Sequence, residues 1–209
     1  MFHLLLAVLT GAGDVMASPD WYPLAPGLSW EYAVTGAQSF GADTADITGL
    51  MTRTVDGVFQ HSAGFPVFRI ISDATFTFTP RSGEEPTSSG ISDTFYVHPT
   101  DSLVLRYQSL DSAETFLMMR LPLEIGSSWV FHPSVPTMDE VVSLDEVVTV
   151  PAGTFQGCSH IHEPYITPET AGSFNDYYFA DGTGLVKFVL HLRSQDRTDD
   201  IVFELRSSH

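Results

Sequence analysis

Two residue types are almost missing from this 209-residue chain, which has one cysteine, Cys158, and one lysine, Lys187. A single thiol excludes an internal disulfide and every zinc site built from several cysteines. A lone cysteine among strand-forming residues is most often a small buried hydrophobic side chain. We therefore expect Cys158 to be buried and unreactive.

Basic residues as a whole are scarce, since nine Lys and Arg stand against 26 Asp and Glu, for a formal net charge of −17. Nucleic acids are bound by clustered lysines and arginines that neutralise phosphates. The acidic residues are spread evenly along the chain, and an even acidic coat repels polyanions. The sequence therefore predicts no nucleic-acid partner, and anionic membrane surfaces are disfavoured for the same reason.

The apolar run from Phe2 to Leu9 is too short to span a bilayer. Val15-Met16-Ala17 follows it with residues that suit a signal-peptidase site, although His3 stands where Lys or Arg is usual. We expect residues 1–17 to be an export signal and the protein to be periplasmic or secreted. A misassigned start codon and a short buried strand are the alternatives.

The residues that are abundant favour strands. The chain has fifteen Phe, seven Tyr and three Trp among 43% hydrophobic residues, together with many Val, Ile and Thr. No window of about twelve residues shows a helical apolar stripe that ends in caps. The length suits a single domain with a sizeable core.

One motif, Pro-Leu-x-x-Gly-x-x-Trp, occurs twice, at residues 23–30 and 122–129. An internal repeat of this kind divides residues 18–209 into two units, 18–120 and 121–209, each with about six strands. Turn signals include Asp56-Gly57, which predicts a hairpin, and residues 151–154. The sequence predicts an all-β, largely antiparallel domain, and it leaves a barrel, a half-barrel and a sandwich open.

Aromatic residues around the repeated tryptophans are candidates for a ligand site. Trp30 and Tyr32 in the first unit, and Trp129 and Phe131 in the second, alternate along predicted strands. Such residues line ligand cavities in small barrels. More often they fill a core, and both interpretations stay open here.

His160 and His162 are the candidate metal ligands. On a strand they project to one face about 6.5–7 Å apart, which suits two imidazole ligands of one ion. His191 on another strand is the third candidate, because Glu163 faces the opposite way. The alternative is a polar surface with Ile161 pointing inward. We expect no convergence, weak binding of divalent metal and no cofactor.

No pattern for catalysis stands out. The chain has no Gly-x-Ser-x-Gly elbow, phosphate-binding glycine loop, dinucleotide fingerprint or EF-hand spacing. We therefore do not predict an enzyme, and a hydrolase or metalloenzyme ranks third among the functions considered.

Three spaced motifs carry a resemblance. They are Tyr-Pro-Leu-x-x-Gly-x-x-Trp-x-Tyr at residues 22–32, Val-Pro-Ala-Gly-Thr-Phe at 150–155 leading to Cys158, and Tyr-Tyr-Phe-Ala at 177–180 before Gly-Leu-Val-Lys at 184–187. With them the chain resembles a group of exported bacterial proteins that has no established activity. It is more distantly similar to the periplasmic lipoprotein-carrier superfamily, whose curved sheet holds acyl chains and is plugged by helices that are not predicted here.

The resemblance implies export and a β fold, and it carries over no catalytic residue. The leading hypothesis is a non-enzymatic binding or accessory module of the cell envelope that holds an apolar or amphipathic small molecule in its curved sheet. The alternative is a structural component that engages an envelope protein through an edge strand.

Overall fold

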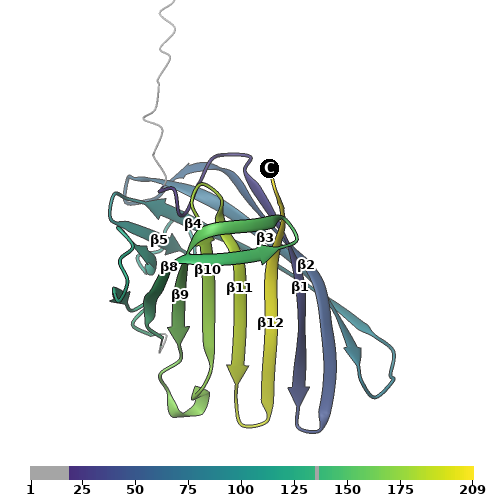
Figure 1. The fold of residues 1–209 in the computed structure, drawn as a ribbon. Helices are drawn as coiled ribbons and strands as arrows, with labels where there is room; N and C mark the ends of the chain where they lie inside the picture. The colour runs from purple at the N-terminus through teal and green to yellow at the C-terminus, as the bar shows by residue number, and fades with distance from the viewer. Residues whose placement is uncertain (1–18, 135–136) are drawn as a thin grey trace, which may run out of the picture.

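The computed structural model of the chain describes residues 19–134 and 137–209, so the expected export signal at residues 1–17 lies outside the described residues. The described chain is almost entirely β-strand, with one 3₁₀ turn at Pro168–Thr170. The prediction of an all-β, antiparallel fold is confirmed. The strands form a single sheet that curls into a nearly closed barrel (Figure 1).

The described residues form twelve strands. They are β1 (Ser29–Phe40), β2 (Asp43–Gln60), β3 (Pro66–Pro80), β4 (Thr87–Pro99), β5 (Leu103–Tyr107), β6 (Phe116–Arg120), β7 (Ser128–Trp129), β8 (Asp139–Val150), β9 (Gly153–Pro164), β10 (Phe174–Ala180), β11 (Gly184–Arg193) and β12 (Arg197–Ser208). Each strand pairs with the next along the chain except β6 with β7.

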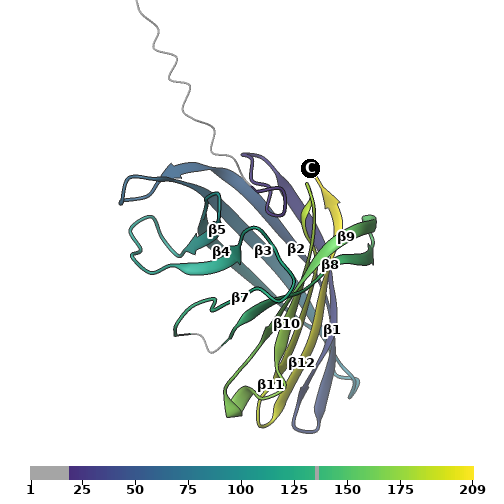
Figure 2. The same ribbon diagram turned by 60° about the vertical axis from the view of Figure 1, so that its left-hand side comes forward.

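The order of strands in the sheet is β6-β5-β4-β3-β2-β1-β12-β11-β10-β9-β8-β7. The first and last strands therefore pair in its middle, while β6 and β7, which are neighbours in sequence, are its two edges. Figure 2 shows β2–β5 on one side of the molecule and β8–β12 on the other. Where the edges approach, the Leu117 amide donates to the Phe131 carbonyl at 2.8 Å, and the rings of Phe116 and Phe131 lie 5.3 Å apart.

The two copies of the repeated motif make the same backbone contacts. Gly27 donates its amide to the carbonyl of Val55, and Gly126 donates to that of Val141, both at 2.8 Å. Each valine then returns its own amide to the residue after the glycine, Leu28 or Ser127. Both valines are fully buried. These bonds fasten each turn to the second strand of its unit.

Alternation along the strands produces the core inside the curled sheet. On β1, Trp30, Tyr32 and Val34 point inward and are 7%, 1% and 1% exposed. Burial of each large apolar side chain contributes about 1.5–3 kcal/mol. The hairpin of β8 and β9 also reaches across to β12, where the Ala152 amide donates to the Leu205 carbonyl at 2.9 Å (Figure 1).

One predicted turn is wrong. Asp56 and Gly57, expected to form a hairpin, lie inside the continuous strand β2, where the register with β3 shifts between Val55 and Gly57. The bulge adds one residue to β2 opposite β3, and the ladder between the two strands continues on both sides of it.

Candidate ligand cavity

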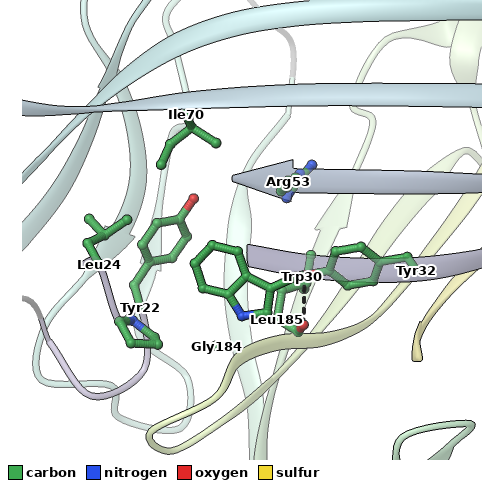
Figure 3. Close-up of a pocket in the computed structure, with 9 residues that line it drawn as sticks. Tyr22, Leu24, Trp30, Tyr32, Arg53, Ile70, Gly184 and Leu185 are labelled. Carbon is green, nitrogen blue, oxygen red and sulfur yellow. Dashed lines mark hydrogen bonds between the residues drawn. The ribbon is translucent and has the colours of Figure 1, made fainter. Parts of the chain in front are cut away.

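Trp30 and Tyr32 line a small pocket near Tyr22 and Leu24, in the close-up of Figure 3. The Trp30 indole Nε1 donates to the Thr183 carbonyl at 2.8 Å, and the Tyr32 hydroxyl donates to the Leu185 carbonyl at 3.0 Å. The pocket holds only about 20 Å³, close to the space that one water molecule needs. These two aromatic residues therefore connect β1 by hydrogen bonds to the β10–β11 turn and to the start of β11, and their rings fill the core.

A second cavity, of about 160 Å³, is lined by side chains from both halves of the chain. Its apolar wall is formed by Met118, Met119, Phe131, Ile161, Phe179 and Phe188. Phe131 lines this cavity, whereas Trp129 does not line it and is 4% exposed. An engineered cavity of about 150 Å³ accommodates benzene, which sets the size of ligand to consider.

Arg53 projects into this cavity from β2. Its position follows from strand alternation, because Met51 and Val55 on either side of it are 6% and 0% exposed and face the same way. Figure 3 shows it on the strand next to Trp30 and Tyr32. Its Nε has no hydrogen-bond partner within residues 19–134 and 137–209. A buried N–H without such a partner has lost hydration that nothing replaces.

Arg106, on β5, lines the same cavity. One of its terminal nitrogens donates to Asp93 Oδ2 at 3.0 Å, and its guanidinium carbon lies 4.3 Å from the centre of the Phe95 ring. Burial lowers the pKa of Arg106 from its ordinary value, with the Asp93 charge opposing the shift. Arginine remains protonated in proteins even so, and two cations therefore border the cavity.

Asp139, the first residue of β8, supplies an acid to the same cavity and is 4% exposed. Burial, and after it the negative charge of Glu163, raise the pKa of Asp139 to about 8. The Trp129 indole N–H opposes this shift but falls short of hydrogen-bond geometry. At neutral pH the Asp139 carboxyl is therefore mostly protonated and can donate a hydrogen bond.

Glu163 lies behind Asp139 on β9 and has its own partners. Its Oε2 accepts hydrogen bonds from Asn175 Nδ2 at 2.7 Å and from the Tyr177 hydroxyl at 2.6 Å. Burial, followed by the charge of Glu163, raises the pKa of Tyr177 well above its usual value. Tyr177 also lines the cavity, so the wall near Asp139 carries both a hydroxyl and a carboxyl group.

The histidine pair lies on the outer face of the sheet. His160 Nε2 and His162 Nδ1 each lie 2.8 Å from the same oxygen, Asp176 Oδ1. His191 is two strands away, hydrogen-bonded to Asp200, and the Phe174 ring lies between it and His162. Within the described ranges, no group of three or more His, Cys, Asp or Glu side chains is arranged to hold a metal ion.

Cys158 is fully buried, and burial raises the pKa of its thiol. The thiol is therefore neutral at physiological pH, whereas the thiolate is the reactive form. Cys158 thus packs as a hydrophobic side chain, as its isolation in the sequence predicts.

Sequence reasoning missed the three charged residues that line the cavity, Arg53, Arg106 and Asp139, and Glu163 behind Asp139. A signal for them was present. Every second residue of a strand faces the same way. Arg53 therefore faces inward with Met51 and Val55, and Glu163 faces inward with Ile161. A charged residue at a core-facing position of a strand marks either a satisfied network or a binding site.

No family model matches the chain, and no curated protein matches its sequence. Among solved structures it is similar to a Bacteroides fragilis protein described as exported and as having a YmcC-like fold, with 12% identity, TM-score 0.48, and coverage of 91% of this chain and 99% of that one. It is also similar to a protein from Parabacteroides distasonis described as a lipoprotein, with 13% identity, TM-score 0.35, and coverage of 92% and 100%. In the described part of the chain, no helix is long and apolar enough to cross a membrane.

Proposed function

We propose that the protein is an exported, non-enzymatic binding module of the cell envelope that holds a small amphipathic anion inside its barrel. The observation that carries this proposal is Arg53, a guanidinium at the wall of an otherwise largely apolar cavity whose Nε has no hydrogen-bond partner in the described residues. A bound carboxylate would supply that partner, because the planar guanidinium matches a carboxylate in a bidentate geometry.

Most of the other arginines of the described structure support this interpretation by contrast. Five of the seven form ion pairs with carboxylates, namely Arg69, Arg81, Arg106, Arg197 and Arg206. Arg53 does not, although the chain carries 26 acidic residues. Methionine and phenylalanine side chains surround the remaining space and suit a short hydrocarbon body.

The test is calorimetric titration of hexanoate, a carboxylate with a short alkyl chain, into the purified protein. We expect saturable one-to-one binding that weakens about tenfold or more in Arg53→Gln. Arg120→Gln, at an exposed position of β6, is the matched control and leaves the affinity unchanged. Equal affinities in all three proteins, or no binding by any of them, would contradict the proposal.

Export is tested separately. The composition of residues 1–17 motivates it. The intact mass of protein recovered from the envelope or medium of the source cell should correspond to a chain that begins at Ser18. Recovery of the chain with Met1 retained from the cytoplasmic fraction would refute this part of the proposal.

A second candidate is engagement of an envelope protein through an edge strand. β4 pairs with β5 only from Tyr96 to Pro99, so within the described residues the stretch from Thr87 to Phe95 has β3 on one side and no paired strand on the other. An edge of this kind can accept another strand. Ile91→Lys would then abolish co-purification of the partner and leave hexanoate binding intact, because a charged edge side chain opposes strand addition.

A further inference from the structure

The cavity has a basic group on its wall from one half of the chain and an acidic group from the other half. Arg53 is the cross-strand partner of Trp30, and Asp139 is the cross-strand partner of Trp129. Each lies two residues before the valine that bonds to the repeated turn. Matched positions of the two motif copies therefore carry a guanidinium and a carboxyl, and both line one cavity.

In the described structure, Asp139 forms no ion pair with Arg53 or Arg106. Arg106 pairs with Asp93, and Glu163 accepts from Asn175 and Tyr177. The Asp139 carboxyl approaches the Trp129 indole N–H without forming a hydrogen bond. The Nε atoms of Arg53 and Arg106 and the Asp139 carboxyl are thus left to interact with whatever the cavity holds.

We infer that the ligand carries an anionic group at one end, a short apolar chain, and an ammonium or other strong hydrogen-bond donor at the other end. The inference rests on the proposed function and specifies the ligand of that site. Arg53, with Arg106, receives the anionic end, the methionines and phenylalanines contact the chain, and Asp139 receives the donor.

The charged and titratable groups around Asp139 determine whether its carboxyl is protonated. They are Glu163 from β9, Tyr177 from β10 and, across the cavity, Arg53, Arg106 and Tyr22. In the empty cavity, burial and Glu163 keep Asp139 mostly protonated at pH 7. An ammonium beside it favours the ionised carboxylate, so binding of a cationic end releases this proton to the buffer.

Three six-carbon probes that differ only in their end groups test the inference: hexanoate, hexylamine and 6-aminohexanoate. We expect 6-aminohexanoate to bind about tenfold more tightly than hexanoate at pH 7, because it adds a charge-assisted hydrogen bond at Asp139. Asp139→Asn should abolish this preference, whereas Arg53→Gln should weaken the binding of both acids. Thermal unfolding of each variant verifies that it is folded.

Proton release provides a second measurement that does not depend on affinity. Titrations in two buffers of different ionisation enthalpy should show release of about one proton when 6-aminohexanoate binds at pH 7. Hexanoate should release none, and Asp139→Asn should release none with either acid.

The outcomes separate this inference from the proposed function. The inference is overturned if hexanoate binding depends on Arg53 but 6-aminohexanoate binds no more tightly. It is also overturned if the preference for 6-aminohexanoate survives Asp139→Asn. Both outcomes leave the proposed function standing. Hexylamine binding as tightly as 6-aminohexanoate also overturns the inference, because the anionic end would then contribute nothing. Failure of all three probes to bind at millimolar concentration overturns both.

Discussion

Gly27 and Gly126 adopt the same left-handed backbone conformation, with φ of 88° and 83°, and each donates its amide to a buried valine on the second strand of its unit. L-residues with a side chain reach this region only at a cost, so glycine at both positions has a conformational reason. A turn that matches in sequence thus matches in backbone geometry and in the bonds that fasten it to the sheet.

Substituting alanine at either glycine should lower the free energy of unfolding by about 1–2 kcal/mol, the cost of the left-handed conformation for a residue with a Cβ. A Cβ at either position meets nothing within 4 Å, so backbone strain alone determines the effect. Urea denaturation measures it. Gly90→Ala, where the φ is not left-handed and a Cβ lies 3.8 Å from the Ala74 carbonyl, is the control and should change stability much less.

Trp30→Ala and Trp129→Ala should each lower the free energy of unfolding by about 3–5 kcal/mol, because both side chains are buried in the core and truncation leaves a cavity. Trp21, which is only half-buried, provides the comparison, and Trp21→Ala should cost clearly less. The midpoint of chemical denaturation reports all three. An unchanged midpoint for either core variant would refute its role in packing.

Asp139 should make the protein less stable as pH rises from about 4 to about 8. Its carboxyl titrates near 3.8 in the unfolded chain and near 8 in the folded protein, so within this window the folded state holds the additional proton. Raising the pH then lowers the free energy of unfolding, by at most about 1.4 kcal/mol per pH unit for one proton.

Asp139→Asn removes this dependence. The stability difference between the variant and the wild type should therefore shift in favour of the variant as pH increases through that window. Urea denaturation at intervals of pH measures the difference, with Asp111→Asn, at an exposed position, as the control. Parallel stability curves for wild type and Asp139→Asn would show that Asp139 does not titrate in this way.

Zinc should bind the outer face only weakly. Burial acts to raise the pKa of Asp176, but the hydrogen bonds from His160 and His162 outweigh it, so its pKa is lowered and the carboxylate stays ionised between the two imidazoles. A tight site needs at least three protein ligands, and His191 is held elsewhere by Asp200. Calorimetric titration of zinc is the test, and submicromolar one-to-one binding that His162→Ala abolishes would contradict this expectation.

The strands could be predicted from sequence because their signals are local. Alternation along β1 and the turn at residues 151–154 each depend on a few adjacent residues, and the structure contains both. The bulge at Gly57 could not be predicted in the same way. It is a shift in the register of β2 against β3, and the short window around Asp56 and Gly57 does not contain that partner strand.

Predicting the cavity would have required contacts between residues still further apart in the sequence. Arg53 and Glu163 stand at inward-facing positions, so their inward direction was readable from alternation. That Arg53, Arg106 and Asp139 border one space follows from the curl of the whole sheet, which brings β2, β5 and β8 around a common interior. The choice between a barrel and a sandwich depends on the same curl, and for this reason the sequence left it open.

The pairing of β1 with β12 has a consequence for how the chain can be divided. The sheet is continuous between residues that are 161 positions apart, such as Gln38 and Asp199, whereas β6 and β7 are joined by a connecting segment with no ladder between them. A polypeptide cleaved directly after Arg120 would keep every hairpin intact. Its two fragments, expressed separately, should therefore reassemble into one particle along the β1–β12 seam.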